Sequence, residues 1–596
     1  MKNEDKLHKT RHSLAHLLAA AVLGKDPDAK LGIGPVIENG FYYDIQTTSP
    51  LSEQQLPGIE KRMREMIKQN FAFEKEEISA DKAKELFKSQ PFKLELIEEL
   101  TKDGKIIAIY KTAHPGSFHV SGSMFHGFAD LCQGPHVNSA KEINPEAFKL
   151  TKIAGAYWRG SEKNPMLTRI YGVAFETKKE LDEYLKLQEE AAKKDHRMLG
   201  EKLELFTFSD KVGKGLPLWL PKGAFIRKKL EDYMQEKEEE SGYQFVVTPH
   251  LTKKDLYETS GHLAHYKEDM YSPIDIDDEK YYLKPMNCPH HHMIYQSKQR
   301  SYRDLPLRIA EFGTVYRYER SGVLTGLIRT RGFTQNDAHI YCTPEQLKSE
   351  FVKVLKLFKK TYKDFGIKDY YFRLSLPDFS NQEKYGDIEN KKTWEFAAKA
   401  AEDAMKTFGA KYQKAEGEAA FYGPKIDAQV KNVLGKEDTI ATVQIDFYMP
   451  ERFDLSYIDK DGKKQRPIII HRAIMGSFDR FFAFLIEKYA GALPVWIMPE
   501  QVWVLPIGKQ HKKYAKKIVK KLKETGIRAV AKEENETIGK KIREGQIQKI
   551  PYLLIVGDKE MKSKSIAVHH REKGDLGAKK LTVFIKQISQ EIENKG

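Results

Sequence analysis

The strand pattern in the middle of the chain, residues 204–498, constrains the fold most. This region contains the runs LPLRIAEFGTVYRYE, GLIRTRGFTQNDAHIYC and DTIATVQIDFYMP, which are rich in β-branched and aromatic residues. Long helical patterns lie between the strands, but helices and strands do not alternate regularly as they would in a βαβ fold. We therefore expect an antiparallel sheet flanked by helices.

Different patterns lie on either side of this region. Residues 1–175 mix short helical and strand patterns with turn signals, which predicts an α+β domain. Residues 176–203 are mostly polar and rich in helix formers, which indicates a helix that connects two domains. Residues 499–596 alternate strands with helices and predict a small α/β domain around a largely parallel sheet. A chain of 596 residues fits three or four domains of about 150 residues each.

The C-terminal region is strongly basic. The net charge of the chain is +15, and residues 499–596 hold 23 lysines and arginines against 12 aspartates and glutamates. A compact basic domain favours a polyanionic partner, and nucleic acid is the leading candidate. No run of about 18 apolar residues predicts a membrane span, and the N-terminus predicts no signal peptide. Three cysteines argue against a disulfide framework and indicate a cytoplasmic protein.

Several arginines lie at the ends of predicted strands. Arg317 and Glu319 stand in TVYRYERSG, Arg329 in IRTRGF, and Arg480 where a strand passes through Gly476 into a helix. The planar guanidinium group matches the oxygens of a phosphate, although single arginines are more often plain surface residues. No Walker-type loop is present, so ordinary P-loop ATP binding is not expected. The lysine-rich MKSKS at 561–565 has no partner motif, and we treat it as chance.

Together these segments resemble the three signatures of class II aminoacyl-tRNA synthetases. The segment GAFIRKKLEDYMQEKEEESGYQFVVTPHL, a predicted helix that leads to Pro249, is similar to the first, dimer-forming signature. YRYE followed by RGF resembles the second signature, and GSFDRF resembles the third. The segments KPMNCPHH, RGFTQNDAHIYC, AFYGPKID, TVQIDF and IIIHRAIMGS narrow the resemblance to threonyl-tRNA synthetases, over nearly the whole chain.

The resemblance implies a multidomain α+β protein with four parts. These are an editing domain (1–175), a linker helix (176–203), a class II catalytic domain with an antiparallel sheet (204–498) and an anticodon-binding domain (499–596). It also implies a homodimer without membrane association. The chain opens directly at the editing domain, so we expect the small ubiquitin-like domain that often precedes it to be missing.

The resemblance further implies one Zn²⁺ per subunit, held by Cys288, His339 and His471. Spacing alone does not group these residues, because they come from three distant segments. One thiolate and two imidazoles suit zinc and leave a coordination position for the amino acid. Zinc that binds both the amino and the hydroxyl group of threonine rejects valine, which has no hydroxyl. The histidines at 290–292 do not match family ligands, and we expect Cys342 to be structural.

In the implied reaction, the threonine carboxylate attacks the α-phosphate of ATP, which binds together with Mg²⁺. The threonyl group is then transferred to tRNA(Thr). Arg317 matches the α-phosphate contact, Arg329 and Arg480 the distal phosphate contacts, and His262 is a candidate for assisting the transfer to tRNA. Glu319 would bind the adenine edge and Phe333 would stack on its face. The residues that match threonine contacts are Gln335, Asp337, Tyr422 and Gln444, with Lys425 as a further contact.

The N-terminal domain is expected to hydrolyse mischarged seryl-tRNA, because zinc cannot exclude serine. RHSLAHLL and DLCQGPHV match the editing signatures, which makes His12, His16, Cys132 and His136 candidates, joined by Asp130. Of two interpretations, we adopt the second. The four residues form a credible zinc set, as in the related alanyl-tRNA synthetase editing domain. The threonyl family instead implies a metal-free site whose side chains position water or shape the pocket.

In the C-terminal domain, Asn535, Arg543 and Glu560 match positions that read anticodon bases. Two residues depart from the family pattern: Asp479 stands in place of a usual Glu in the third signature, and His569 in place of a common anticodon-reading Arg. The first departure could shift a metal or ATP contact by one methylene, and the second could alter base contacts. The competing hypotheses are another class II synthetase, seryl or prolyl, and an RNA-binding regulator that kept the fold.

Overall fold

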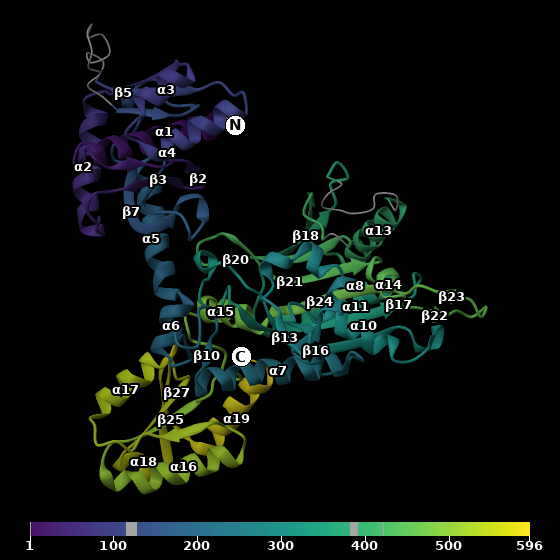
Figure 1. Ribbon diagram of the computed structural model, residues 1–596. Coiled ribbons are helices and arrows are strands. Elements are labelled where there is room, and N and C mark those ends of the chain that lie inside the picture. Colours follow the sequence, from purple (N-terminus) through teal and green to yellow (C-terminus); the bar gives the residue numbers. More distant parts are fainter. Residues whose placement is uncertain (1, 115–127, 382–390, 421, 596) are drawn as a thin grey trace. The chain divides into compact units, whose positions relative to one another are not determined.

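A computed structural model describes residues 2–114, 128–381, 391–420 and 422–595 (Figure 1). The chain forms two compact units, residues 1–189 and 190–596. Helix α5 (Lys178–Lys194) covers most of the predicted linker and crosses from the first unit into the second. The finer domain bounds at 175, 203 and 498 stay a prediction. None of the helices in the described ranges combines the length and the hydrophobicity that crossing a bilayer requires.

The first unit is built on two antiparallel sheets. The larger has the strand order β1-β3-β8-β7 with β2 paired to β3, and the smaller has the order β4-β5-β6. Helix α1 (Lys2–Leu23) buries Leu14, Leu17 and Leu18, whose spacing places them on one helical face, in the main core of the unit. The other elements are β1 (Lys30–Leu31), β2 (Val36–Ile37), β3 (Gly40–Gln46), α2 (Leu56–Lys68), β4 (Ala72–Glu77), α3 (Ala80–Leu86), α4 (Pro91–Lys102), β5 (Ala108–Ala113), β6 (Phe128–Leu131), β7 (Phe148–Tyr157) and β8 (Met166–Ala174).

An eight-stranded sheet organises the second unit. Its strand order is β11-β16-β17-β24-β21-β20-β18-β19, and all neighbours from β16 to β18 are antiparallel, as predicted. The two edge strands, β11 and β19, pair in parallel with their neighbours instead. The strands are β11 (Gln244–Phe245), β16 (Leu307–Tyr316), β17 (Gly332–Cys342), β18 (Tyr370–Leu376), β19 (Tyr412–Glu416), β20 (Lys425–Lys431), β21 (Glu437–Asp446) and β24 (Ile468–Ser477).

Four long helices bury their apolar faces against this sheet. In α11 (Leu347–Asp364), Phe351, Val354 and Phe358 recur at helical spacing and lie in the same core cluster as the sheet. The other three are α7 (Pro221–Glu239), α13 (Lys391–Phe408) and α15 (Phe478–Lys488). Shorter elements complete the region: α6 (His196–Lys202), β9 (Phe206–Thr207), β10 (Leu218–Trp219), β12 (Leu251–Lys253), α8 (Lys254–Thr259), α9 (His262–His265), β13 (Ile274–Ile276), β14 (Glu279–Leu283), α10 (Cys288–Gln296), β15 (Arg300–Ser301), α14 (Met449–Arg452), β22 (Tyr457–Ile458) and β23 (Lys464–Gln465).

The C-terminal part of this unit contains a five-stranded sheet, ordered β26-β25-β27-β28-β29. The first three strands are parallel, but β28 and β29 are antiparallel, so the sheet is mixed rather than largely parallel. Only residues 557–564 join β27 to β28, which is too short for a parallel crossover. The elements are β25 (Val502–Pro506), α16 (Lys512–Glu524), β26 (Ala529–Ala531), α17 (Ile538–Ile547), β27 (Tyr552–Val556), α18 (Asp558–Ser563), β28 (Ser565–His570), β29 (Gly574–Lys580) and α19 (Leu581–Glu593).

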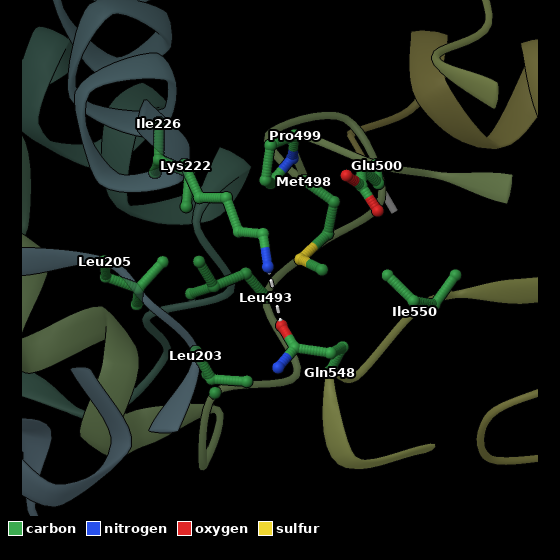
Figure 2. A pocket seen from close by; sticks show the side chains of 11 residues that line it. Leu203, Leu205, Lys222, Ile226, Leu493, Met498, Pro499, Glu500, Gln548 and Ile550 are labelled. Atoms are coloured by element: carbon green, nitrogen blue, oxygen red, sulfur yellow. Dashed lines mark hydrogen bonds between the residues drawn. The ribbon is translucent and has the colours of Figure 1, made fainter. Parts of the chain in front are cut away.

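A small apolar pocket lies where α7 meets segments of the C-terminal part (Figure 2). Leu203, Leu205 and Ile226 line it together with Leu493, Met498 and Ile550. At its edge Lys222 donates to the side-chain oxygen of Gln548 at 2.8 Å. Side chains from widely separated segments therefore pack together within this unit.

Candidate active sites

Cys288, His339 and His471 meet on the eight-stranded sheet. Strands β17 and β24 pair so that His339 lies directly opposite His471, and Cys288 begins helix α10. One ligand atom from each residue lies within 4.8 Å of the other two, and all three residues could hold a metal ion. The register of two strands thus brings together residues that are 132 positions apart in the sequence.

Hydrogen bonds fix the orientation of both imidazoles. Nε2 of His471 donates to Oδ2 of Asp446 at 2.8 Å, since a carboxylate only accepts, and this leaves Nδ1 for a ligand. Nδ1 of His339 lies 2.7 Å from Nδ1 of His291, and Nε2 of His291 lies 3.2 Å from Oε2 of Glu311. Because Glu311 accepts the His291 proton, His291 accepts from His339, and Nε2 of His339 keeps its lone pair.

Burial shifts the pKa values of two of the three residues, Cys288 and His339. It raises the pKa of the Cys288 thiol well above its ordinary value, helped by the nearby carboxylates of Asp337 and Asp446. Burial also lowers the pKa of His339 well below its ordinary value, so this imidazole is neutral. Neutral imidazoles are the form that binds a metal, and a coordinated thiol loses its proton to the ion. The donor set therefore fits a divalent cation of the zinc type.

The residues predicted to contact threonine surround these three side chains. Gln444 lies opposite His471 across one strand pair and opposite Lys425 across the other. The Tyr422 hydroxyl donates to the side-chain oxygen of Gln444, and the Tyr422 ring lies 5.4 Å from that of His471. Asp337 accepts from Nδ2 of Asn287 at 3.1 Å, and burial raises its pKa. Gln335 stands two residues earlier on the same face of β17.

An open cleft of about 620 Å³ lies beside this group. The Arg317 guanidinium lies over the Phe333 ring at 5.2 Å, which would leave the other ring face for a planar ligand. Nε of Arg329 donates to Oε2 of Glu319 at 2.9 Å. All five residues predicted to bind ATP line this cleft, together with Gln335: Arg317, Glu319, Arg329, Phe333 and Arg480.

Asp479 and His262 do not line this cleft. Asp479 is buried, and its carboxylate accepts the backbone N–H of Thr334 at 3.0 Å, which links the start of α15 to β17. The expected effect of the shorter acid on a metal or ATP contact stays a prediction. His262 is also buried, with Nδ1 2.6 Å from the hydroxyl of Ser260 and Nε2 3.1 Å from Sδ of Met286.

A second cluster of titratable groups lies in the first unit. His12 and His16 on α1 meet Cys132 and His136, with ligand atoms within 4.8 Å of one another. The rings of His12 and His136 stack with their centroids 4.1 Å apart. Sγ of Cys132 lies 3.3 Å from Nε2 of His12 and 3.4 Å from Nε2 of His136. Sequence-distant segments again converge on one site.

The hydrogen bonds of this cluster form a directed chain. The Val137 N–H donates to Oγ of Ser13, and Oγ lies 3.1 Å from Nδ1 of His136. At the other end Nδ1 of His12 donates to the Pro135 carbonyl at 3.1 Å, so Nε2 of His12 accepts the Cys132 S–H. Burial and the Asp130 charge raise the pKa of Cys132 to about 12, so the sulfur carries its proton at neutral pH in the absence of a cation.

Asp130 is held by two residues that the sequence did not single out. Nζ of Lys93 lies 2.5 Å from Oδ1 of Asp130, and the Tyr43 hydroxyl donates to Oδ2 at 2.5 Å. Nε2 of His16 lies 3.5 Å from the same Oδ2. All four side chains are buried. Lysines are almost always exposed, so nothing in the sequence marks Lys93 as a buried one.

The predicted anticodon residues lie on the C-terminal part. Asn535 and Arg543 are exposed, just before and within α17. Glu560 on α18 accepts the backbone N–H of Gly557 at 2.9 Å, so its carboxylate already caps its own helix. His569 lies on β28, paired with Leu553 of β27. The geometry places these residues but does not bring them into one cluster.

Family models match three segments of the chain. A class II tRNA synthetase core domain (G, H, P, S and T) matches residues 268–489, and an anticodon binding domain matches residues 501–594. A threonyl and alanyl tRNA synthetase second additional domain matches residues 121–171.

Known proteins are similar over most of the chain. Threonine–tRNA ligase of Anoxybacillus flavithermus is 49% identical, and the match covers 98% of this chain and 88% of that protein. The same ligase of Geobacillus kaustophilus is 50% identical over 98% of this chain and 87% of that protein. A crystal structure described as the RNA binding domain of a threonyl-tRNA synthetase from Cryptosporidium parvum is 37% identical. It covers 67% of this chain and 98% of that chain, with a TM-score of 0.62.

Proposed function

The chain belongs to the threonyl-tRNA synthetases, and we propose that it joins threonine to tRNA(Thr) at the expense of ATP and hydrolyses seryl-tRNA that it has formed in error. The observation that carries this proposal is the position of the Cys288, His339 and His471 group beside an arginine-lined cleft on one sheet. The four-part division of the chain at residues 175, 203 and 498 is part of the same proposal.

In the first step, the threonine carboxylate attacks the α-phosphate of ATP, and pyrophosphate leaves. Arg317 would contact the α-phosphate, and Arg480 and Arg329 the distal phosphates, so that charge is neutralised and the reacting groups are held in line. Arg329 would exchange the carboxylate of Glu319 for a phosphate, which frees Glu319 to accept from the adenine amino group. Phe333 would stack on the adenine ring. ATP is used as its Mg²⁺ complex.

Cys288, His339 and His471 would hold one Zn²⁺ per subunit. A bound zinc ion supplies a Lewis-acidic position that ligates an amino and a hydroxyl group. Asp337 would accept from the threonine ammonium group, and Gln335, Tyr422, Lys425 and Gln444 would enclose the side chain. In the second step, a hydroxyl of the terminal tRNA ribose displaces AMP from the adenylate. His262 is our candidate for assisting this step.

The editing reaction is hydrolysis of the seryl ester by water. We propose a metal-free site, because the hydrogen bonds of Ser13, His136, Cys132 and His12 run in one direction and each proton has an acceptor. His12 and His16 would position the water and Asp130 would orient His16. In the C-terminal domain, Asn535, Arg543 and Glu560 would contact anticodon bases, and Glu560 would first release the Gly557 N–H.

We also propose a cytoplasmic homodimer. Val247, in the segment that resembles the dimer-forming signature, is 94% exposed, more than any other large hydrophobic residue in the described part of the chain. All three cysteines are free thiols, which fits a reducing compartment. A binding-only regulator is the weaker hypothesis, since Arg317, Arg329 and Arg480 all line one cleft.

Amino-acid-dependent ATP–pyrophosphate exchange tests the proposal, with threonine, serine and valine, before and after removal of zinc. We expect exchange with threonine, weaker exchange with serine, little with valine, and loss of all exchange when the metal content falls. The same preparation should hydrolyse seryl-tRNA, and His12→Ala should slow this hydrolysis without changing exchange. Exchange that does not depend on threonine would refute threonine as the amino acid that is activated. Exchange that persists after verified zinc loss would refute the ligand set.

A further inference from the structure

His196 is a buried histidine that the proposed mechanism does not use. It is the first residue of α6, it follows the end of α5 by two residues, and its side chain is 1% exposed. Together with Asp195 and Glu487 it forms a third group that could hold a metal by distance alone. The hydrogen bonds of its ring point to a different role.

Both ring nitrogens of His196 have partners that fix the tautomer. The backbone N–H of Leu327 donates to Nε2 at 3.1 Å, so Nε2 carries a lone pair and no proton. Nδ1 therefore carries the proton and donates to Oε1 of Glu487 at 2.7 Å. A ring whose two nitrogens are occupied in this way has no lone pair to offer an ion. His196 is instead a neutral bridge between two parts of the chain.

The first part is the tight turn from Thr325 to Arg329. The backbone N–H groups of Thr325 and Arg329 each donate to the carbonyl of the other residue at 3.2 Å. Gly326, at the apex, has a φ of +46°, and a Cβ added there would lie 2.1 Å from Nε2 of His196. The imidazole thus packs directly against the turn. Thr325, Ile328 and Arg329 from this turn line the cleft described above.

The second part is helix α15. Glu487 lies seven residues after Arg480, which is two helical turns, so both side chains project from the same side of the helix. Ser477 caps the start of this helix by accepting the backbone N–H of Arg480 at 3.1 Å. One imidazole therefore links the turn that carries Arg329 to the helix that carries Arg480.

We propose that His196 is a positioning residue for ATP, which sets the distance between the two arginines assigned to its distal phosphates. The proposal rests on the proposed function, because it takes the cleft to be the ATP site. Holding the turn in place before ATP arrives removes part of the ordering cost of binding. The effect belongs to ATP and not to threonine, since the hydrogen bonds of His196 described above reach Glu487 and Leu327 and not the Cys288 group.

Two matched substitutions separate the bonds of the ring. In His196→Asn, the amide N–H₂ can replace Nδ1–H toward Glu487, but no atom reaches Leu327. In His196→Gln, the amide oxygen can take the place of Nε2 and accept the Leu327 N–H. Threonine-dependent ATP–pyrophosphate exchange would be measured with the full chain, with ATP and threonine varied separately. We expect H196N to raise KM for ATP about tenfold with little change in KM for threonine, because it leaves a buried N–H without an acceptor. H196Q keeps the Leu327 bond but leaves Glu487 without the Nδ1–H donor, so it should also raise KM for ATP, because the bridge needs both bonds.

Two controls guard this result. The thermal unfolding midpoint of each variant is measured, and Gly326→Ala provides a second approach, since its methyl group would displace the turn from His196 without changing the ring. We expect G326A also to raise KM for ATP selectively. An unchanged KM for ATP in H196N, in H196Q or in G326A, or equal rises in the KM values for ATP and threonine, would overturn the proposal. Absence of threonine-dependent exchange in the wild-type chain would instead refute the proposed function.

Discussion

At the scale of single residues, the orientation of two proposed zinc ligands, His339 and His471, depends on side chains that would not contact the ion. His291 accepts from His339 and donates to Glu311, while Asp446 orients His471. Glu311 also accepts the Thr248 N–H at 2.8 Å and lies 3.5 Å from Nζ of Lys284. Burial opposes ionisation of this carboxyl, but the His291 hydrogen bond and the Lys284 charge outweigh it and lower the Glu311 pKa to about 2. A fixed negative charge therefore stands behind the imidazole pair.

Removing that charge should weaken zinc binding. In Glu311→Gln the shape is kept, but the Glu311 carboxylate no longer polarises His291, so we expect zinc affinity to fall about tenfold or more. Zinc affinity is measured by competition with a chelator. Glu350→Gln is the control, because Glu350 is equally buried and ion-paired, with Arg308 at 2.7 Å, but lies on α11. Equal losses of zinc affinity in the two variants would show a general stability effect and contradict the proposed role of Glu311 in polarising His291.

Sequence periodicity could have pointed to some of these residues but not to others. Asp446 lies two positions after Gln444, so strand periodicity alone places both on one face of β21. His291 lies three positions after Cys288, on the same helical face. Glu311 belongs to a different strand, and only the pairing of β16 with β17 brings it near, which no local pattern encodes. Lys93 and Tyr43 likewise come near Asp130 only in the folded chain, so no local sequence pattern predicts their role.

At the scale of secondary-structure elements, periodicity predicts the antiparallel core sheet but not its edges. The parallel pairing of β11 and β19 depends on where long connections return, and a two-residue strand such as β11 has no measurable period. In the C-terminal sheet, strands alternate with helices. The short helix α18 nevertheless reverses the chain direction, so β28 pairs antiparallel with β27. Alternation predicted the class of this domain and missed the direction of its last two strands.

The junction between β24 and α15 gives an element-scale prediction. Gly476 has a φ of +59°, and a Cβ there would lie 2.8 Å from the Ile440 carbonyl oxygen. Gly476→Ala should therefore cost about 1–3 kcal/mol of unfolding free energy and displace the start of α15, which raises KM for ATP through Arg480. Chemical denaturation and exchange kinetics measure both effects.

Gly462→Ala is the matched control for this prediction. Gly462 also has a positive φ, +77°, but open space around its Cα. We expect the control to show the backbone cost alone, with an unchanged KM for ATP. If G476A destabilises the protein no more than G462A does, the close approach to Ile440 has no energetic consequence.

At the scale of the whole molecule, positive charge is concentrated where RNA is expected to bind. Helix α16 buries Ala515, Ile518 and Leu522 and exposes lysines along the opposite side. Every lysine that meets a phosphate releases counterions, so affinity for tRNA should fall linearly with salt on logarithmic axes. Catalysis of pyrophosphate exchange involves no tRNA and should not share this dependence.

A stripe of three exposed lysines on α16 tests this charge. Simultaneous substitution of Lys513, Lys517 and Lys521 by Glu should weaken tRNA binding and reduce the magnitude of the salt slope by about one for each phosphate that these lysines neutralise. Threonine-dependent exchange should stay unchanged, since α16 packs on the C-terminal sheet and contributes nothing to the lining of the cleft. Binding is measured by fluorescence anisotropy of labelled tRNA at several salt concentrations.

The control carries the same change in net charge on another helix, with Glu at positions 356, 359 and 363 of α11, all of which are exposed lysines. If the effect came only from net charge, both triple variants would lose affinity equally, because each changes the charge of the chain by six. A local interaction predicts that only the α16 variant shows a smaller slope as well as weaker affinity, since slope counts the phosphates touched and long-range repulsion is screened within about 10 Å at 0.1 M salt. Equal salt slopes in the two variants would therefore show that α16 is not part of the RNA-binding surface.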